Sequence, residues 1–328
     1  MKAYLADRYG GLEVMRLGEL PEPVAGKGEV VVAVIATSIN PIDWKLRAGM
    51  LRFLPGARFP RAFGTEFSGV IHELGPGVQG WAVGDPVYGI SVTALGRQGS
   101  HAERVAVPAS ALRRKPEALS HDDAATLTVA ALTALNGLRL CGDLAGKSVL
   151  VNGATGGVGH FAVQIAKAKG ARVTAVCSAA NAPFARELGA DAVLDYRVDD
   201  VTKRDDKFDV VFDAHGHLGF GVACRVLATR GCYVTPLGEP RVLLRSLVQN
   251  LFGRRKLLIG NVRSEPQDYA EIEGLVASGA VHPHIAREFS LDQAHEAFAL
   301  QEKGGVPGKV VVRVTPGRRE RRVSGLDT

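Results

Sequence analysis

The chain has 328 residues, more than one hydrophobic core usually supports, so we expect two domains. Its 46% hydrophobic and 23% charged residues are typical of a globular protein, and no apolar run approaches the length of a membrane span. The net charge of +6 comes partly from the arginine-rich residues 315–328, which we interpret as a disordered, solvated tail, so no nucleic-acid partner is expected.

The first 118 residues alternate short apolar segments with glycine and proline turns. Residues 28–36 are almost all apolar and predict a strand buried on both faces, and residues 67–74 alternate in part. Turn signals follow at residues 75–77 and 84–86. Short strands between such turns predict a β-rich, partly open barrel and not a parallel sheet.

A different pattern begins near Ser120, where serine followed by Asp123 marks a helix start and leads into an apolar run that reaches Leu135. Strands and helices then alternate, and a helix over 182–188 ends at Gly189. The expected strands are residues 149–152, 172–177, 192–195, 209–213 and 232–235. This alternation predicts an α/β fold with a doubly wound parallel sheet, the Rossmann architecture.

The remaining elements continue without an internal repeat. A basic helix over 241–256 is followed by a strand over 257–262. Further helices are expected over 268–278 and 294–300, and a strand over 309–314 closes the folded part of the chain.

A glycine-rich turn directly follows the first strand of the alternating region. The spacing of Ala154, Gly156 and Gly159 is the dinucleotide fingerprint G-x-G-x-x-G with alanine in the first place. Backbone N–H groups at the start of the next helix can hold a pyrophosphate, because the helix dipole is positive there. We therefore predict a dinucleotide site formed by Ala154, Gly156, Gly157, Val158 and Gly159.

The loop after the second strand of this region favours NADP over NAD. In NAD-type folds an acidic residue about 20 residues past the glycines accepts hydrogen bonds from the adenosine ribose. Residues 177–181 hold no carboxylate here, while Ser178 and Asn181 can donate to a 2′-phosphate, with Tyr196 and two arginines, Arg186 and Arg197, on neighbouring elements. The alternative is that Ser178 and Asn181 only shape a turn.

Several motifs in order resemble the zinc-free medium-chain dehydrogenases/reductases of the quinone oxidoreductase (zeta-crystallin-like) branch. They cover nearly all of the chain and lie at residues 38–45, 63–70, 84–89, 131–134, 152–159, 208–213 and 308–312. The resemblance implies a GroES-like catalytic domain from residues 1–118 with 280–314, and a Rossmann NADP-binding domain over 119–279. Relatives are often dimers, so the resemblance also implies a homodimer.

The zinc ligands of the metal-dependent relatives are replaced. Asn40 stands where those relatives have cysteine, and Thr65 stands where they have histidine. An amide and a hydroxyl do not replace the thiolate and imidazole that zinc requires, and Glu66 alone does not form a site. Without a Lewis acid, oxidation of simple alcohols is disfavoured, whereas hydride transfer from NADPH to an enone or quinone needs only hydrogen-bond donors.

The resemblance places Asn40 and Lys45 at the reaction site. Asn40 is expected to position the nicotinamide or a substrate oxygen, and Lys45 to polarise a carbonyl or deliver a proton. Many quinone oxidoreductases have tyrosine in place of Lys45, so this residue brings the chain closer to enone reductases. The alternative is a lysine that faces solvent.

The same resemblance assigns Thr133, Leu237 and Gly238 to the nicotinamide side of the cofactor. Arg263 and Lys309 are candidates for phosphate contacts, with solvated cations as the alternative. Two other functions stay open: a zinc-independent carbonyl or alcohol oxidoreductase, and a non-catalytic nucleotide- or RNA-binding protein.

The cysteines and the N-terminal residues bear on the location of the protein. The four cysteines are scattered without a C-x-x-C pair, which disfavours a disulfide framework and a structural zinc site. The first eight residues lack the apolar core of a signal peptide. We therefore expect a cytoplasmic protein that acts on a small molecule and has no membrane partner.

Overall fold

The computed structural model describes residues 1–50, 52, 58–91, 97–236, 238, 240–260 and 262–314. Unit 1 comprises Met1–Val129, Ile285–Gly304 and the described part of Lys309–Thr328, and unit 2 comprises Ala130–His284 and Gly305–Gly308. The expected cofactor contact Leu237 and the basic tail of residues 315–328 lie outside the described residues. No helix among the described residues is both long enough and apolar enough to cross a bilayer.

The described residues of unit 1 form two sheets and three α-helices. In the larger sheet the strand order is β15-β16-β3-β5-β6-β8, and β7 also pairs with β3. Its strands are β3 (Glu29–Ser38), β5 (Glu66–Leu74), β6 (Pro86–Ile90), β7 (Arg104–Pro108), β8 (Leu112–Arg114), β15 (Ile285–Ser290) and β16 (Lys309–Arg313). The smaller sheet has β1 (Lys2–Ala6) between β2 (Met15–Glu19) and β4 (Arg61–Ala62), and the helices are α1 (Pro41–Arg47), α2 (His121–Ala124) and α9 (Ala294–Lys303).

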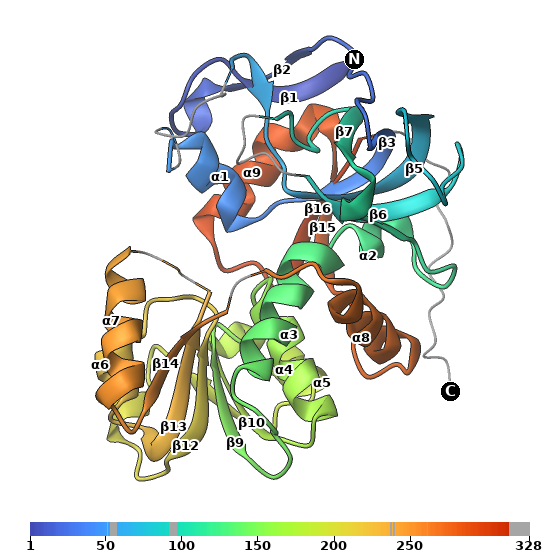
Figure 1. Ribbon diagram of the computed structural model, residues 1–328. Coiled ribbons are helices and arrows are strands. Elements are labelled where there is room, and N and C mark those ends of the chain that lie inside the picture. The colour runs from blue at the N-terminus through green and yellow to red at the C-terminus, as the bar shows by residue number, and fades with distance from the viewer. Residues whose placement is uncertain are drawn as a thin grey trace. The chain divides into compact units, whose positions relative to one another are not determined.

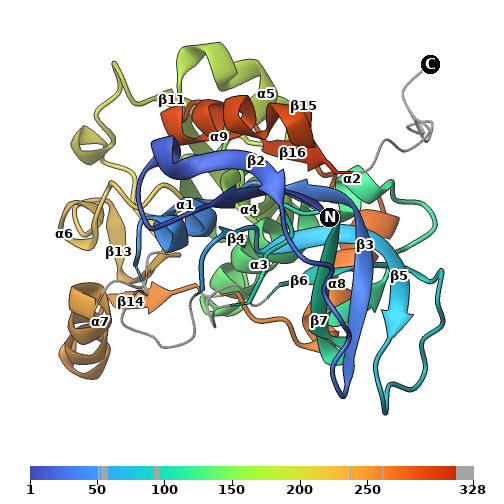
Figure 2. The same ribbon diagram turned by 90° about the horizontal axis from the view of Figure 1, so that it is seen from above.

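One long-range pairing in unit 1 positions the site described below. Strand β16 runs antiparallel to β3, with Val311 opposite Ser38 and Val312 opposite Thr37. This register brings Lys309, at the start of β16, to the end of β3, where α1 begins. Figure 2 shows β16 and β15 lying beside α9.

Unit 2 is a parallel six-stranded sheet with the order β11-β10-β9-β12-β13-β14. The strands are β9 (Ser148–Asn152), β10 (Arg172–Cys177), β11 (Ala192–Asp195), β12 (Phe208–Asp213), β13 (Leu227–Thr235) and β14 (Lys256–Ile259). Counted along the chain this order is 3-2-1-4-5-6, which confirms the predicted Rossmann sheet.

Helices cover both faces of this sheet (Figure 1). One face carries α3 (Leu132–Arg139), α4 (Gly159–Ala168) and α5 (Ala182–Glu187), and α8 (Pro266–Ala277) packs against α3. The opposite face carries α6 (Phe220–Ala223) and α7 (Pro240–Phe252). Strand order reverses between β9 and β12, so the glycine-rich turn after β9 lies at the point where such folds bind ligands.

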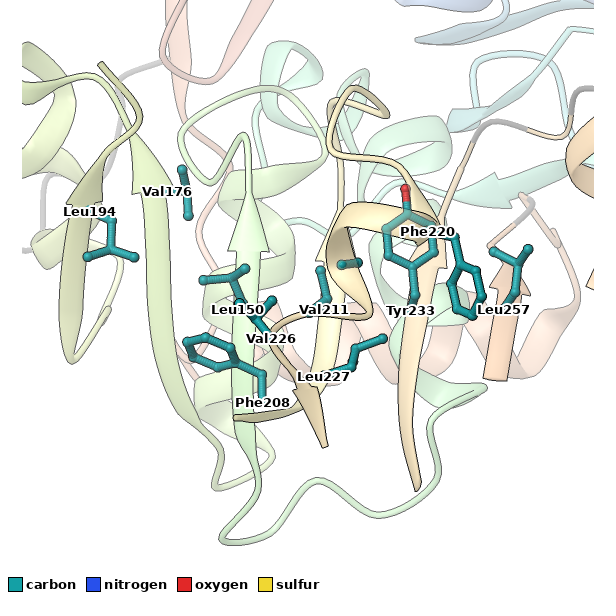
Figure 3. Packing of buried hydrophobic residues seen from close by; sticks show 11 residues of the cluster. Leu150, Val176, Leu194, Phe208, Val211, Phe220, Val226, Leu227, Tyr233 and Leu257 are labelled. Atoms are coloured by element: carbon teal, nitrogen blue, oxygen red, sulfur yellow. The ribbon is translucent and has the colours of Figure 1, made fainter. Parts of the chain in front are cut away.

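A hydrophobic cluster under α6 fixes β12 and β13 in this sheet (Figure 3). Phe220 of α6 packs edge-on against Tyr233 of β13, with ring centroids 5.8 Å apart. Each fully buried large apolar side chain of the cluster contributes about 1.5–3 kcal/mol. The Tyr233 hydroxyl leaves the cluster and donates to Asp213 at the end of β12, 2.7 Å away.

The helix expected to run from Ser120 to Leu135 is wrong as a single element. The structure has the short helix α2, a π-helical turn over Leu127–Ala131, and then α3. The backbone N–H of Val129, inside the π turn, donates to the Glu66 carboxylate at 2.6 Å. A backbone donor drawn out of the i→i−4 pattern in this way is typical of a π turn.

The first unit boundary therefore falls after Val129 and not after residue 118, because α2 contacts β3 and β5 of unit 1. The second falls after His284, directly before β15 begins. The expected basic helix over 241–256 ends earlier, at Phe252, before Gly253.

Candidate functional site

The glycine-rich turn of unit 2 links the end of β9 to the start of α4. Gly153 has φ of +75°, a backbone conformation that favours glycine. The N–H groups of Gly153 and Ala154 both donate to the Val176 carbonyl of β10 at 3.1 Å, and Gly156 donates back to Gly153. These hydrogen bonds hold the turn against the carboxyl ends of β9 and β10.

Two glycines of the turn have different surroundings. A Cβ on Gly159 would lie 2.0 Å from the Gly153 carbonyl oxygen, so only glycine allows α4 to approach the strand this closely. A Cβ on Gly156 would meet only that same oxygen, at 3.4 Å, with open space elsewhere. The backbone at Gly156 is thus accessible to a ligand from outside.

The start of α4 is suited to an anion. The N–H groups of Gly157 and Val158 donate to no backbone carbonyl within the described chain, and the first turn of α4 carries no acidic side chain. Free N–H groups and the positive end of a ten-residue helix together favour a phosphate. The turn therefore fits the pyrophosphate of a dinucleotide.

The structure gathers the residues predicted to contact the adenosine end beside this turn. Ser178 follows β10 and is half-buried, and the Asn181 amide donates to the Thr155 hydroxyl of the turn at 3.3 Å. The exposed Tyr196 follows β11, and its N–H donates to the Cys177 carbonyl at 3.2 Å. Burial raises the pKa of Cys177, as does the nearby Asp195, while Arg186 lowers it, so both signs of charge surround this loop.

Sequence reasoning missed how Asp213 organises the loop after β12. Its buried carboxylate accepts from the Asn152 amide at 2.7 Å, from the Tyr233 hydroxyl, and from the N–H groups of Gly216 and Leu218. The Asn152 contact joins the ends of β9 and β12 at the point where strand order reverses. An aspartate that ends a buried strand was the available signal.

Two histidines of that loop were also missed. A Cβ on Gly153 would lie 3.1 Å from His215 Cβ, so this histidine lies next to the glycine-rich turn. The Nδ1 atoms of His215 and His217 are 2.8 Å apart, which requires one ring to donate and the other to accept.

Unit 1 contains a buried polar network at the start of α1. Lys309 and Glu66 form an ion pair with an N–O distance of 3.0 Å, and their side chains are 3% and 0% exposed. The Glu66 carboxylate also accepts from the Asn40 amide at 2.8 Å and from the Ser38 hydroxyl, and Val129 satisfies its other oxygen. A charged pair is tolerated in such a place only when hydrogen bonds satisfy both partners.

The ammonium of Lys309 is fully used within this network. Its three donors reach the Asn40 side-chain oxygen at 2.6 Å, Glu66 at 3.0 Å and the Ile39 carbonyl at 3.4 Å. The expected phosphate contact of Lys309 is therefore not supported, because no donor is left for a phosphate. Asn40 is 2% exposed, with both ends of its amide bonded in the network.

The other residues predicted for the site do not belong to the network of Asn40, Glu66 and Lys309. Lys45 is half-buried on α1, five residues after Asn40, and its side chain makes no hydrogen bond or ion pair with any described residue. Thr133 is the second residue of α3 and is buried, and Gly238 is exposed after β13. The side-chain oxygen of Thr65 is buried without a hydrogen-bond partner within the described chain.

Two family models match the chain, the alcohol dehydrogenase GroES-like domain over residues 26–117 and the zinc-binding dehydrogenase over residues 188–312. The chain is 33% identical to the 2-methylene-furan-3-one reductase of Solanum lycopersicum, over 96% of this chain and 80% of that protein. The quinone oxidoreductase of Coxiella burnetii is similar in structure, with a TM-score of 0.87 and 31% identity over 96% of this chain and 99% of that one. A mycobacterial protein complexed with NADPH has a TM-score of 0.82 and 27% identity, over 96% and 100% of the two chains.

Proposed function

This chain belongs to the quinone oxidoreductase branch of the medium-chain dehydrogenase/reductase family, and we propose that it uses NADPH to reduce the activated double bond of α,β-unsaturated carbonyls or quinones without zinc. The observation that carries this proposal is the buried network of Asn40, Glu66 and Lys309. It determines which residues are left to activate a substrate.

The donor set of unit 1 does not fit a zinc ion. The carboxylate of Glu66 is neutralised by the Lys309 ammonium, and the Asn40 oxygen accepts from that same ammonium. A metal would have to displace a buried cation to reach these oxygens, and zinc prefers thiolate, imidazole or carboxylate donors. Among the described residues no group of three His, Cys, Asp or Glu side chains could hold a metal.

Activation of the substrate falls instead to hydrogen-bond donors, and Lys45 is the residue we assign to this role. Asn40, fixed by Lys309 and Glu66, begins helix α1, and its N–H donates to the Asp43 carboxylate at 2.8 Å. This arrangement anchors the helix that carries Lys45. The Lys45 ammonium donates to the carbonyl oxygen of the substrate and stabilises the negative charge that forms there.

NADPH supplies a hydride when it is bound. The β-carbon of an enone would be suited to receive that hydride, because the charge would be delocalised onto oxygen, where Lys45 would stabilise it. Lys45 or water then provides the proton at the α-carbon. The similarity to a 2-methylene-furan-3-one reductase supports a conjugated acceptor of this kind.

The preference for NADPH is supported by the loop after β10. Residues 178–181 carry no carboxylate that would repel a 2′-phosphate, and Ser178 and Asn181 supply donors. Arg186 and Arg197 add positive charge near this loop. Asp195, a nearby acid, offsets part of it. The similarity to a protein complexed with NADPH supports the same choice.

The test is a turnover panel with NADPH and NADH, several enones and several quinones, with the products identified by mass spectrometry and NMR. The proposal expects faster consumption of NADPH, a saturated ketone from an enone, and unchanged turnover after dialysis against a chelator. An allylic alcohol would favour the zinc-independent carbonyl reductase. Untouched NADPH across the panel, with salt-dependent RNA binding, would favour a non-catalytic role.

A further inference from the structure

Two cysteines of unit 2, Cys141 and Cys232, lie opposite each other where α3 crosses β13. Helix α3 approaches this strand closely at Gly137, where a Cβ would lie 3.2 Å from Cγ1 of Val234. Cys141 lies four residues further along the chain, two residues after α3 ends, which places it about 6 Å further in the direction of the helix. Cys232 lies two residues before Val234 on the same face of β13, about 6.6 Å along the strand.

The distance from Gly137 to Cys141 thus matches the distance from Val234 to Cys232. The two thiols therefore lie together, about one helical turn beyond the contact between Gly137 and Val234. The Cys141 thiol donates to the Gly137 carbonyl at 3.8 Å and lies next to the Cys232 thiol. Cys141 is 7% exposed, whereas Cys232 is half-buried and accessible to a small reagent.

Two lysines surround the pair. Lys147 reaches over Cys141 and donates to its carbonyl oxygen at 3.1 Å, and Lys256 is the cross-strand partner of Cys232 on β14. The neighbouring Cys141 thiol, with these two cations, lowers the pKa of Cys232 against the opposing effect of burial. The neighbouring Cys232 and burial raise the pKa of Cys141, so Cys232 is the more readily ionised of the two thiols.

We propose that Cys141 and Cys232 form a dithiol that a hydroperoxide oxidises to an intramolecular disulfide. The pair lies away from the glycine-rich turn, because Cys232 is level with Val149 near the beginning of β9, whereas the turn follows the other end of that strand. It is thus a modification site separate from the proposed cofactor site, just beyond the end of α3, the helix that carries Thr133.

The chemistry balances in two steps. The Cys232 thiolate attacks one oxygen of the hydroperoxide, the O–O bond breaks, and a sulfenic acid forms on Cys232 with release of an alcohol or water. The Cys141 sulfur then attacks the Cys232 sulfur, the S–O bond breaks, and the departing hydroxide leaves as water with the Cys141 proton. Two thiols lose two electrons, and one peroxide gains them.

The test treats the full-length protein with hydrogen peroxide and measures its intact mass and its non-reduced peptides. We expect the loss of two hydrogen atoms, one cross-linked pair of peptides containing Cys141 and Cys232, and full reversal by dithiothreitol. The variant Cys224→Ser, which changes a half-buried cysteine outside the pair, should give the same cross-link. Sulfinic acid on Cys232 without a cross-link in the wild-type protein, or preferential oxidation of Cys224, would overturn the proposal.

Alkylation kinetics give a second readout that does not depend on the disulfide. Iodoacetamide should label Cys232 at a rate that rises through about pH 7. In Cys141→Ala the neighbouring thiol is lost, and the rate at pH 7 should fall about tenfold as the pKa of Cys232 moves toward the ordinary cysteine value. Equal rates in the two proteins, with matching melting curves, would refute the activation of Cys232 by Cys141.

Discussion

Replacing Lys309 by methionine tests the buried network of unit 1 directly. Methionine keeps the length and apolar stem of lysine but removes the ammonium that contacts Glu66, Asn40 and the Ile39 carbonyl. Glu66 is 0% exposed, so its carboxylate would be left buried with no compensating cation. The Asn40 side-chain oxygen would lose its donor as well.

The size of the effect follows from the burial of both partners. Breaking a buried ion pair by removing one partner costs about 3–5 kcal/mol, several times the value of an exposed pair. Lys309→Met should therefore lower the free energy of unfolding of unit 1 by that amount. The matched control Lys27→Met changes an exposed lysine and should stay within about 0.5 kcal/mol of the wild-type protein.

Urea denaturation followed by tryptophan fluorescence is suited to this measurement, because both tryptophans, Trp44 and Trp81, belong to unit 1. A double-mutant cycle completes it, since Glu66→Gln combined with Lys309→Met replaces the ion pair by neutral groups. The double variant should be more stable than the sum of the single effects predicts, by at least about 1 kcal/mol. Additive effects in the cycle would refute the ion-pair reasoning. So would a Lys309→Met protein as stable as the wild type, with the same dependence of its unfolding free energy on urea concentration.

Four further outcomes are expected. Lys45→Met should lower kcat for enone reduction about 10- to 100-fold in stopped-flow traces, with the Kd for NADPH unchanged, because it removes the donor at the carbonyl oxygen; an unchanged kcat would return Lys45 to solvent. Gly159→Ala should abolish NADPH binding in calorimetry, since its Cβ would lie 2.0 Å from the Gly153 oxygen, and wild-type affinity would contradict that role for the turn. Ser178→Asp should shift the ratio of kcat/KM values toward NADH about tenfold or more by repelling the 2′-phosphate, and a constant ratio would argue against this loop as the selector. Leu247→Asp should convert the proposed homodimer to a monomer in light scattering, because α7 exposes an apolar face that includes Leu247, next to the outermost strand β14; a monomeric wild-type protein would exclude the dimer.

The glycine-rich turn was predictable because its signals are local. The strand, the small residues and the helix that form it are contiguous from Ser148 to Ala168, and glycine at 153 and 159 is required by backbone geometry within the turn itself. The parallel sheet followed from the regular alternation of strands and helices.

The network of unit 1 was not predictable in this way. Lys309 lies 243 residues from Glu66 and 269 from Asn40 along the chain, and only the pairing of β16 with β3 brings them together. The break in the helix after α2 has the same origin, because Val129 donates to a carboxylate from another strand. Local propensity favoured one continuous helix, and a tertiary hydrogen bond overrode it.

Charge balance connects this network to the reaction class. A buried carboxylate needs a positive partner, and a metal ion and a lysine ammonium are alternative ways to provide one. The ammonium of Lys309 is directed at Glu66, Asn40 and a carbonyl, so its charge is consumed inside the protein and none of its donors is left to polarise a substrate. Under the proposed function, a chain organised in this way is suited to acceptors that spread the incoming negative charge themselves, with a hydrogen bond from Lys45. Enones and quinones meet that requirement, whereas a simple ketone concentrates the charge on one oxygen, and the oxidation of a simple alcohol is disfavoured for the same reason in reverse.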